Sequence, residues 1–216
     1  MNQYIEITLL PNSDINLFGL WSKVFQQIHL GLVEMQNHQK QVPIGISFPE
    51  YVAGEKYSVL GSKLRLFAED EATLVGFEAA KWLSRLSDYV HCTSIRPVPD
   101  KWTGYAIYHR QQPKTNKERL ARRYAKRHKL DFETALNGTV VLRDQSTQFR
   151  YCDMPQQSIK TPFIRLQSLS SGQAFCLWIK KTLVSESVTG HYSSYGLSAT
   201  AAVPEFWPKF LCFLKM

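Results

Sequence analysis

The order of apolar patterns along the first 95 residues constrains the fold of this chain more than any other feature. Residues 4–10 alternate apolar and polar side chains, which is typical of a strand with one buried face. Residues 15–35 instead repeat apolar side chains at helical spacing, so we expect an amphipathic helix there. Its predicted apolar stripe consists of Leu17, Trp21, Val24, Phe25, Ile28 and Leu32.

Four further segments continue this succession of strands and helices. Residues 42–48 and 63–67 predict strands, residues 69–86 a second helix with an acidic start, and residues 89–94 a fourth strand. The resulting order, β-α-β-β-α-β, is that of a ferredoxin-like (RRM-like) domain. We therefore predict an α+β protein whose first domain spans residues 1–97. This topology serves many functions and assigns none by itself.

The second half of the chain differs from the first in charge. Residues 96–104 contain two prolines and a glycine and predict a linker, so residues 98–216 form a second, smaller α+β domain in this interpretation. The whole chain carries a net charge of +8, and residues 114–129 alone hold eight lysines and arginines against one glutamate. Such concentrated positive charge is typical of a surface that binds a polyanion. Nucleic acid is the leading candidate, and an anionic membrane surface is the weaker one.

The basic segment has helical spacing, and we expect an arginine-rich helix over residues 116–129. On a helical projection, five cations share an arc of about 140°; they are Arg119, Arg122, Arg123, Lys126 and Arg127. Ala121 and Ala125 lie on the opposite side, where they can pack against the domain but would anchor a membrane poorly. A solvated surface helix is the alternative, although only Glu118 is available to neutralise this face. The preference for arginine suits bidentate contacts with phosphate.

Several protein classes are disfavoured by what the sequence lacks. It contains no run of about 18 apolar residues and no secretory signal, so we expect no membrane association and a cytoplasmic location. Cys92, Cys152, Cys176 and Cys212 have neither zinc-site nor disulfide-framework spacing, and we expect free thiols. There is no HExxH motif, CxxC pair, carboxylate cluster or P-loop, so neither a metal nor another cofactor is predicted.

One histidine and one serine-rich turn are candidate catalytic groups. His29 lies at the edge of the first helix's apolar stripe, where a partly exposed imidazole can act as a general acid or base. Taken alone, such a histidine is more often structural. Ser168 and Ser170 precede a predicted turn at residues 171–172. Together with a basic surface, these groups suggest RNA cleavage in which a histidine deprotonates a 2′-OH without a metal.

Seven segments resemble, in the same order, those of the type I-F (Csy-type) CRISPR repeat-processing endoribonucleases. They are YIEITLLP, WSKVFQQIHLGLV, IGISFPEY, LGSKLRLFA, HRQQPKTNKERLARRYAKRH, IRLQSLSSGQAF and YGLS, and they extend over residues 1–198. The resemblance implies a metal-independent endoribonuclease that binds the CRISPR repeat hairpin and cleaves the 3′ base of its stem by 2′-OH attack. The product carries a 2′,3′-cyclic phosphate. The protein would then stay bound to the mature crRNA beside the backbone subunits of a type I-F effector complex.

The resemblance also implies roles for particular residues. His29 matches the catalytic histidine, Ser168 the serine that positions the 2′-OH, and Tyr195 a tyrosine that orients the histidine. Arg110 and Gln112 match two residues that read purine edges at the base of the stem. A guanidinium suits guanine and an amide suits adenine in this role.

Other residues are expected to bind the RNA. The phosphate-contacting face of the basic helix would consist of Arg119, Arg122, Arg123, Lys126 and Arg127. Lys126 occupies a position where the family has arginine, and its ammonium group cannot form the paired, planar hydrogen bonds of a guanidinium. Ser170 matches a nearby serine with a weaker role, and Phe175 an aromatic residue that stacks on the terminal base pair. On sequence alone Phe175 would more often belong to the core, because it shares a strand face with Leu177 and Ile179.

Alternatives to this interpretation remain open. The same protein could be a non-cleaving RNA-hairpin-binding subunit of a ribonucleoprotein complex, or, less favoured, a general binder of double-stranded nucleic acid. A defence complex and a transposon-associated complex would look alike in sequence. Residues 138–160 match the family poorly and are not assigned. The apolar and aromatic tail, residues 204–216, could dock on a neighbouring subunit.

Overall fold

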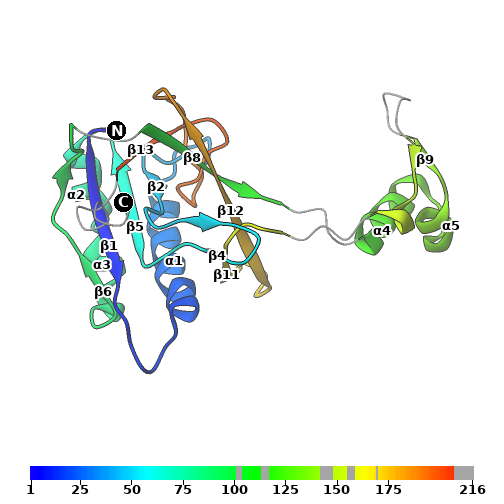
Figure 1. Ribbon diagram of the computed structural model, residues 1–216, viewed down its shortest axis with the longest axis horizontal. Helices are drawn as coiled ribbons and strands as arrows, with labels where there is room; N and C mark the ends of the chain where they lie inside the picture. Colours follow the sequence, from blue (N-terminus) through cyan, green and yellow to red (C-terminus); the bar gives the residue numbers. More distant parts are fainter. Residues whose placement is uncertain (101–103, 113–116, 142–147, 155–158, 169, 207–216) are drawn as a thin grey trace. The chain divides into compact units, whose positions relative to one another are not determined.

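The first sheet of the computed structural model is built around β1 (Gln3–Leu9), which pairs antiparallel with three other strands (Figure 1). Its order is β2–β5–β1–β6, and β7 also pairs with β1. These strands are β2 (Gly45–Ser47), β5 (Lys63–Ala68), β6 (Val90–Cys92) and β7 (Arg96–Pro97). The structure describes residues 1–100, 104–112, 117–141, 148–154, 159–168 and 170–206.

Helix α1 (Leu17–Glu34) lies where the sequence predicts it. It begins at Asn16, whose side-chain oxygen accepts a hydrogen bond from Gly19 N at 2.8 Å. Most of the predicted apolar stripe is buried, namely Trp21, Val24, Phe25, Ile28 and Leu32. Leu17 is instead 42% exposed, because it is the first residue of the helix and lies at its free end.

The helix predicted over residues 69–86 is divided into three short pieces. Helix α2 (Glu71–Phe77) is capped by Asp70, as its acidic start suggested. Glu78 adopts the left-handed conformation, with φ of 50°, and ends that helix. Helix α3 (Ala79–Trp82) and the 3-10 turn η1 (Ser84–Leu86) follow. Periodicity cannot show this break, because glutamate has no local preference for a left-handed conformation.

A second antiparallel sheet has the order β11–β12–β8–β13. Its strands are β11 (Phe163–Gln167), β12 (Ala174–Val184), β8 (Gly104–Gln111) and β13 (Val203–Glu205). From their apolar residues, residues 173–179 and 183–188 would be expected to form two separate strands, but β12 is continuous because the polar residues between them pair with β8. Residues 192–195 would also be expected to form a strand, but Tyr192 forms only an isolated bridge with Val42.

One hydrophobic core spans both sheets, because α1 contacts β1 of the first and β11 of the second. Ile164 and Leu177 of the second sheet belong to the same buried cluster as Ile28. The chain therefore divides differently from the boundary predicted near residue 97. One compact unit, unit 1, contains residues 1–111 and 160–216, and the other, unit 2, contains residues 112–159. The physical reason is that strands beyond residue 97 complete a core begun before it.

Two small hairpins and a helical segment complete the structure. Strands β3 (Val52–Ala53) and β4 (Ser58–Val59) pair within unit 1. Unit 2 contains α4 (Lys117–His128), α5 (Phe132–Asn137), the paired strands β9 (Val140–Val141) and β10 (Gln148–Phe149), and the 3-10 turn η2 (Tyr151–Asp153). The described part of residues 138–160, which the sequence left unassigned, thus includes a short hairpin and one helical turn.

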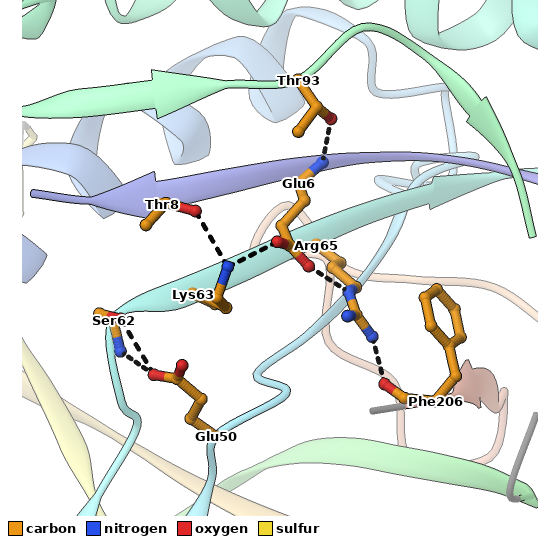
Figure 2. Close-up of polar contacts among 8 residues, drawn as sticks. All are labelled: Glu6, Thr8, Glu50, Ser62, Lys63, Arg65, Thr93 and Phe206. Carbon is orange, nitrogen blue, oxygen red and sulfur yellow. Dashed lines mark hydrogen bonds and ion pairs between the residues drawn. The ribbon is translucent and has the colours of Figure 1, made fainter. Parts of the chain in front are cut away.

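A partly buried ionic network ties the end of the described chain to the first sheet (Figure 2). Arg65 is only 2% exposed; its Nε lies 2.8 Å from Glu6 Oε2, and its Nη1 donates to the carbonyl oxygen of Phe206 at 2.6 Å. Lys63 Nζ contacts the other carboxylate oxygen of Glu6 at 2.7 Å. The Arg65 guanidinium also lies 3.9 Å from the centroid of the Phe206 ring. Residues 207–216, most of the predicted docking tail, lie outside the described residues.

Two further findings concern the cysteines and the helices. Cys92, Cys152 and Cys176 are free thiols, as expected, and Cys212 lies outside the described residues. Within the described part of the chain, every helix is too short or too polar to cross a lipid bilayer.

Candidate functional site

His29 is held by two contacts with the segment that follows β12. Its Nδ1 lies 2.8 Å from the backbone carbonyl oxygen of Ser194. A carbonyl oxygen can only accept, so Nδ1 carries the proton and Nε2 is the unprotonated nitrogen of the neutral ring. The ring of Tyr195 stacks on the imidazole, with centroids 4.2 Å apart and planes 6° from parallel. The half-buried imidazole is therefore fixed in both tautomer and orientation.

The turn that supplies Ser194 and Tyr195 is anchored to β2. Gly196 accepts a hydrogen bond from Ile46 N at 3.0 Å and donates one to Ser193 O at 2.7 Å. Its φ of 65° is a left-handed conformation, and a Cβ at this position would lie 2.5 Å from Ile46 Cγ2. Both the backbone angle and the close approach require glycine. The first sheet thus positions the groups that hold His29.

Arg110 links Phe175 to the ring of Tyr195. The Arg110 guanidinium, at the end of β8, is 5.9 Å from the ring centroid of Tyr195 and 5.7 Å from that of Phe175 on β12. Phe175 is half-buried at the margin of the core, so the core interpretation of this residue is partly correct. Four predicted site residues are therefore brought together: His29, Tyr195, Arg110 and Phe175.

Ser168 and Ser170 lie in the turn that joins β11 to β12. The turn is closed by hydrogen bonds from Ser168 N to Gln173 O at 2.9 Å and from Gly172 N to Ser168 O at 2.8 Å. The two serine hydroxyl oxygens are 3.2 Å apart. Among the described residues, no direct hydrogen bond joins Ser168 to His29. The structure thus places the serine in a closed turn of unit 1, where its hydroxyl contacts Ser170 and Ser171.

Helix α4 of unit 2 has two different faces. Ala121 and Ala125 are buried, as predicted, and the opposite face exposes Arg119, Arg122, Arg123, Lys126 and Arg127. The exposed pair between Glu118 and Arg122, at 3.8 Å, neutralises little of this charge. The ring of Tyr124 stacks on His128 of the same helix at 4.1 Å. It also lies 5.8 Å from the ring of Tyr151, and this contact holds the helix against η2.

The two predicted base-reading residues fall on either side of the division between the units. Arg110 is the penultimate residue of β8 in unit 1, whereas Gln112 is exposed and begins unit 2. Burial, and then the charge of Lys180, lower the pKa of His109, so this imidazole next to Arg110 is neutral at neutral pH. Within the described ranges, no group of three or more histidine, cysteine or acidic side chains could hold a metal ion.

One functional atom could not be found by sequence reasoning, namely the carbonyl oxygen of Ser194. Every residue has such an oxygen, so its role depends only on the fold. The one signal in the sequence is the glycine that follows Tyr195, because glycine favours turns but does not show which strand the turn contacts.

Comparison with known sequences decides the family. The family model of the CRISPR-associated protein Cas_Csy4 matches residues 4–206. The chain belongs to this Csy4 family. A Csy4 relative, the CRISPR-associated endonuclease Cas6/Csy4 of Escherichia coli (strain UTI89 / UPEC), is 35% identical over 207 residues, covering 95% of this chain and 100% of the relative. The Cas6/Csy4 endonuclease of Pseudomonas aeruginosa (strain UCBPP-PA14) is 33% identical with the same coverage.

These Csy4 relatives confirm the predicted family and the predicted enzyme class, a CRISPR RNA-processing endoribonuclease. A solved structure described as an RAMP protein binding different RNA substrates covers 94% of this chain and 99% of its own. Its identity of 12% and TM-score of 0.32 are too low to support a further conclusion.

Proposed function

We propose that this Csy4-family protein cleaves the CRISPR repeat hairpin at the 3′ base of its stem by 2′-OH attack, without a metal ion. The observation that carries the proposal is the hydrogen bond between His29 Nδ1 and Ser194 O. This bond leaves Nε2 as the basic nitrogen of the ring. A histidine held in one tautomer and one orientation suits general acid–base catalysis.

In the proposed reaction the substrate supplies its own nucleophile. His29 Nε2 accepts the proton of the 2′-OH, the 2′-oxygen attacks the adjacent phosphorus, and the bond from phosphorus to the 5′-oxygen breaks. The departing 5′-oxygen takes up a proton from solvent, and His29 returns its own proton to solvent. The products are a 2′,3′-cyclic phosphate on the hairpin and a 5′-hydroxyl on the released strand. Every step is a proton transfer or a substitution at phosphorus, and none requires a metal or another cofactor.

Ser168 is the proposed positioning residue for the 2′-OH. Its hydroxyl lies 3.2 Å from that of Ser170 and 3.4 Å from Ser171 N, so the turn itself restricts where the hydroxyl can point. A hydroxyl can donate one hydrogen bond and accept two, so it keeps capacity for a ribose oxygen. Tyr195 would keep the plane of the imidazole constant during proton transfer, and Ser170 would support the turn.

Arg110 and Gln112 would recognise the base of the stem, and Phe175 would stack on it. Arg110 can read the O6 and N7 atoms of guanine, and Gln112 the N6 and N7 atoms of adenine. Phe175, at the margin of the core, is the proposed stacking platform for the terminal base pair. Because the Arg110 guanidinium already lies near the Tyr195 and Phe175 rings, the base-reading group and the catalytic histidine share one local support.

The exposed cations of α4 would bind the phosphates of the hairpin. Arg119, Arg122, Arg123, Lys126 and Arg127 all project from one helix face. Arginine on such a face can form paired hydrogen bonds with phosphate oxygens. The RNA-binding role predicted for residues 98–216 would thus rest on unit 2 together with Arg110 and Phe175 of unit 1.

We further propose that the first sheet and its helices form a ferredoxin-like domain. The strand order β2–β5–β1–β6, with α1 after β1 and α2 after β5, supports this assignment. After cleavage the protein would keep the mature crRNA and join the backbone subunits of a type I-F effector complex in the cytoplasm.

The test is a cleavage assay on a labelled repeat hairpin in EDTA. We expect wild type to cleave and to leave a 2′,3′-cyclic phosphate. His29→Ala should reduce the rate about 10²- to 10⁴-fold while binding persists, and a 2′-deoxy sugar at the stem base should abolish cleavage. His38→Ala, which changes an exposed histidine elsewhere in unit 1, is the matched control. Tight binding without cleavage by wild type would leave only the non-cleaving hairpin-binding subunit.

A further inference from the structure

A groove of about 610 Å³ in unit 1 carries positive charge on three of its walls. Lys23 comes from α1, Arg85 from η1 and Arg165 from β11. All three side chains are exposed, and among the described residues none of them forms an ion pair. No acidic residue is among those that line the groove in the described structure. A hollow of this kind favours an anionic ligand.

The groove lies next to the proposed catalytic residues. Gln26, on its α1 wall, precedes His29 by three residues, so the two side chains are neighbours on the helix surface. Gln167, on its β11 wall, directly precedes Ser168. An extended ligand that passes His29 and Ser168 can therefore continue into the groove. The amide side chains there can donate to or accept from ribose and base groups.

We propose that this groove binds the phosphates of the single-stranded RNA that continues 3′ from the cleaved bond. The inference rests on the proposed function. On the 5′ side of the cleaved bond the strand is part of the stem, and the opposite strand leaves the stem base from the other side of the helix. Only the segment that continues 3′ emerges next to His29 and Ser168. Arginine and lysine would contact its phosphates without reading sequence.

The test measures binding of uncleavable hairpins that carry a 2′-deoxy sugar at the stem base. One RNA ends at the cleavage position, a second carries a 3′ oligouridine flank, and a third carries the same flank at its 5′ end. Wild type is compared with Lys23→Gln/Arg165→Gln. The control, Lys56→Gln/Arg96→Gln, removes the same charge from exposed positions outside the groove.

We expect the 3′ flank to strengthen binding several-fold for wild type and for the control, but not for the groove variant. The salt slope of the variant with the 3′-flanked RNA should fall by about 1.4, at about 0.7 for each cation removed from a single strand. Its affinity for the unflanked hairpin and its thermal unfolding should match those of wild type.

Three outcomes would overturn the proposal. These are no gain from the 3′ flank with wild type, an equal gain from the 5′ flank, or an equal loss of affinity for flanked and unflanked hairpins in the groove variant. Failure of the proposed function would look different. Wild type would then leave an all-ribose hairpin uncut in EDTA, whatever the flanks contributed to binding.

Discussion

The rings of His29 and Tyr195 lie 4.2 Å apart between centroids and only 6° from parallel. The stack restricts tilting of the imidazole, while the hydrogen bond from Nδ1 to Ser194 O restricts its rotation within the ring plane. Both partners come from one turn, so they move together. The orientation of the proposed general base therefore depends on that turn as much as on α1.

Replacement of Tyr195 separates the role of its ring from that of its hydroxyl. Tyr195→Leu removes the stack, and we expect single-turnover cleavage to slow about 10- to 100-fold, because small misplacements of a reacting group are costly. Tyr195→Phe keeps the ring and should cleave at nearly the wild-type rate. Hairpin affinity is measured in parallel. If the Phe variant is as slow as the Leu variant, the hydroxyl and not the stack is important.

Gly196→Ala tests the anchor of the turn on β2. We expect this variant to lose about 1–3 kcal/mol of unfolding free energy more than Gly172→Ala, because only at Gly196 does the new methyl group collide with a neighbour. Gly172 is a matched control, since its φ is 67° and nothing lies within 4 Å of its Cβ position. Denaturant unfolding of both variants gives the comparison. Equal losses of unfolding free energy in the two variants would mean that the Ile46 side chain moves aside without destabilising the protein.

Arg110→Ala tests base recognition at the foot of the stem. We expect the preference for guanine over other bases at that position to fall by roughly 1–3 kcal/mol. The measurement is binding to a set of hairpins that differ only in the terminal base pair. A uniform loss of affinity across the whole set would assign Arg110 to phosphate binding or to support of Tyr195.

Arg123→Ala tests the cationic face of α4. Binding should weaken by a similar factor for every hairpin sequence, and the slope of log affinity against log salt should flatten by about one. Arg150→Ala is a suitable control in the same unit, because that guanidinium lies 2.6 Å from Asp153 and its charge is already paired. An unchanged slope for Arg123→Ala would exclude a direct phosphate contact.

The Glu6 network predicts a loss of stability in acid. Burial pushes the pKa of Glu6 up, but hydrogen bonds from Lys63 and Arg65 outweigh it and lower the pKa below the ordinary 4.5. The unfolded state therefore binds this proton at higher pH than the folded state. The stabilisation is complete above the ordinary pKa and is lost as pH falls through the folded value. Unfolding followed from pH 7 into this acid range should show the loss in wild type, and Glu6→Gln should reduce it. An unchanged pH dependence in Glu6→Gln would contradict the assignment.

Sequence patterns predicted most elements of unit 1, because strands and helices with one buried face repeat their apolar residues regularly. They also predicted the two faces of α4, since Ala121 and Ala125 are small and the remaining positions are charged. They did not predict which sheet would cover α1. From the sequence, the apolar face of β11 and β12 could equally have formed a separate core. The domain boundary was therefore predicted near residue 97, whereas unit 1 continues to residue 111 and resumes at residue 160.

Tertiary contacts also limited how much of the candidate site could be predicted from the sequence. His29 was a candidate from its position on the first helix, and Tyr195, Arg110 and Phe175 were identified through a family resemblance; contacts in the structure link all four. Ser194 acts through its backbone and has no signal in its side chain. The left-handed conformation of Glu78, which divides the second predicted helix, likewise has no signal in the sequence.

Unit 2 is inserted between the two segments of unit 1, and the points of insertion bear on which sequence changes the protein can tolerate. The chain leaves unit 1 at Gln111 and returns near Thr161, and the side chains of these two residues are joined by a hydrogen bond at 2.9 Å. Unit 1 is thus closed by its own residues at the point of insertion. We therefore expect the segment between them to tolerate changes of length and sequence without disturbing the fold of unit 1 or the contacts around His29. A chain in which a short glycine–serine linker replaces residues 112–159 should still unfold cooperatively.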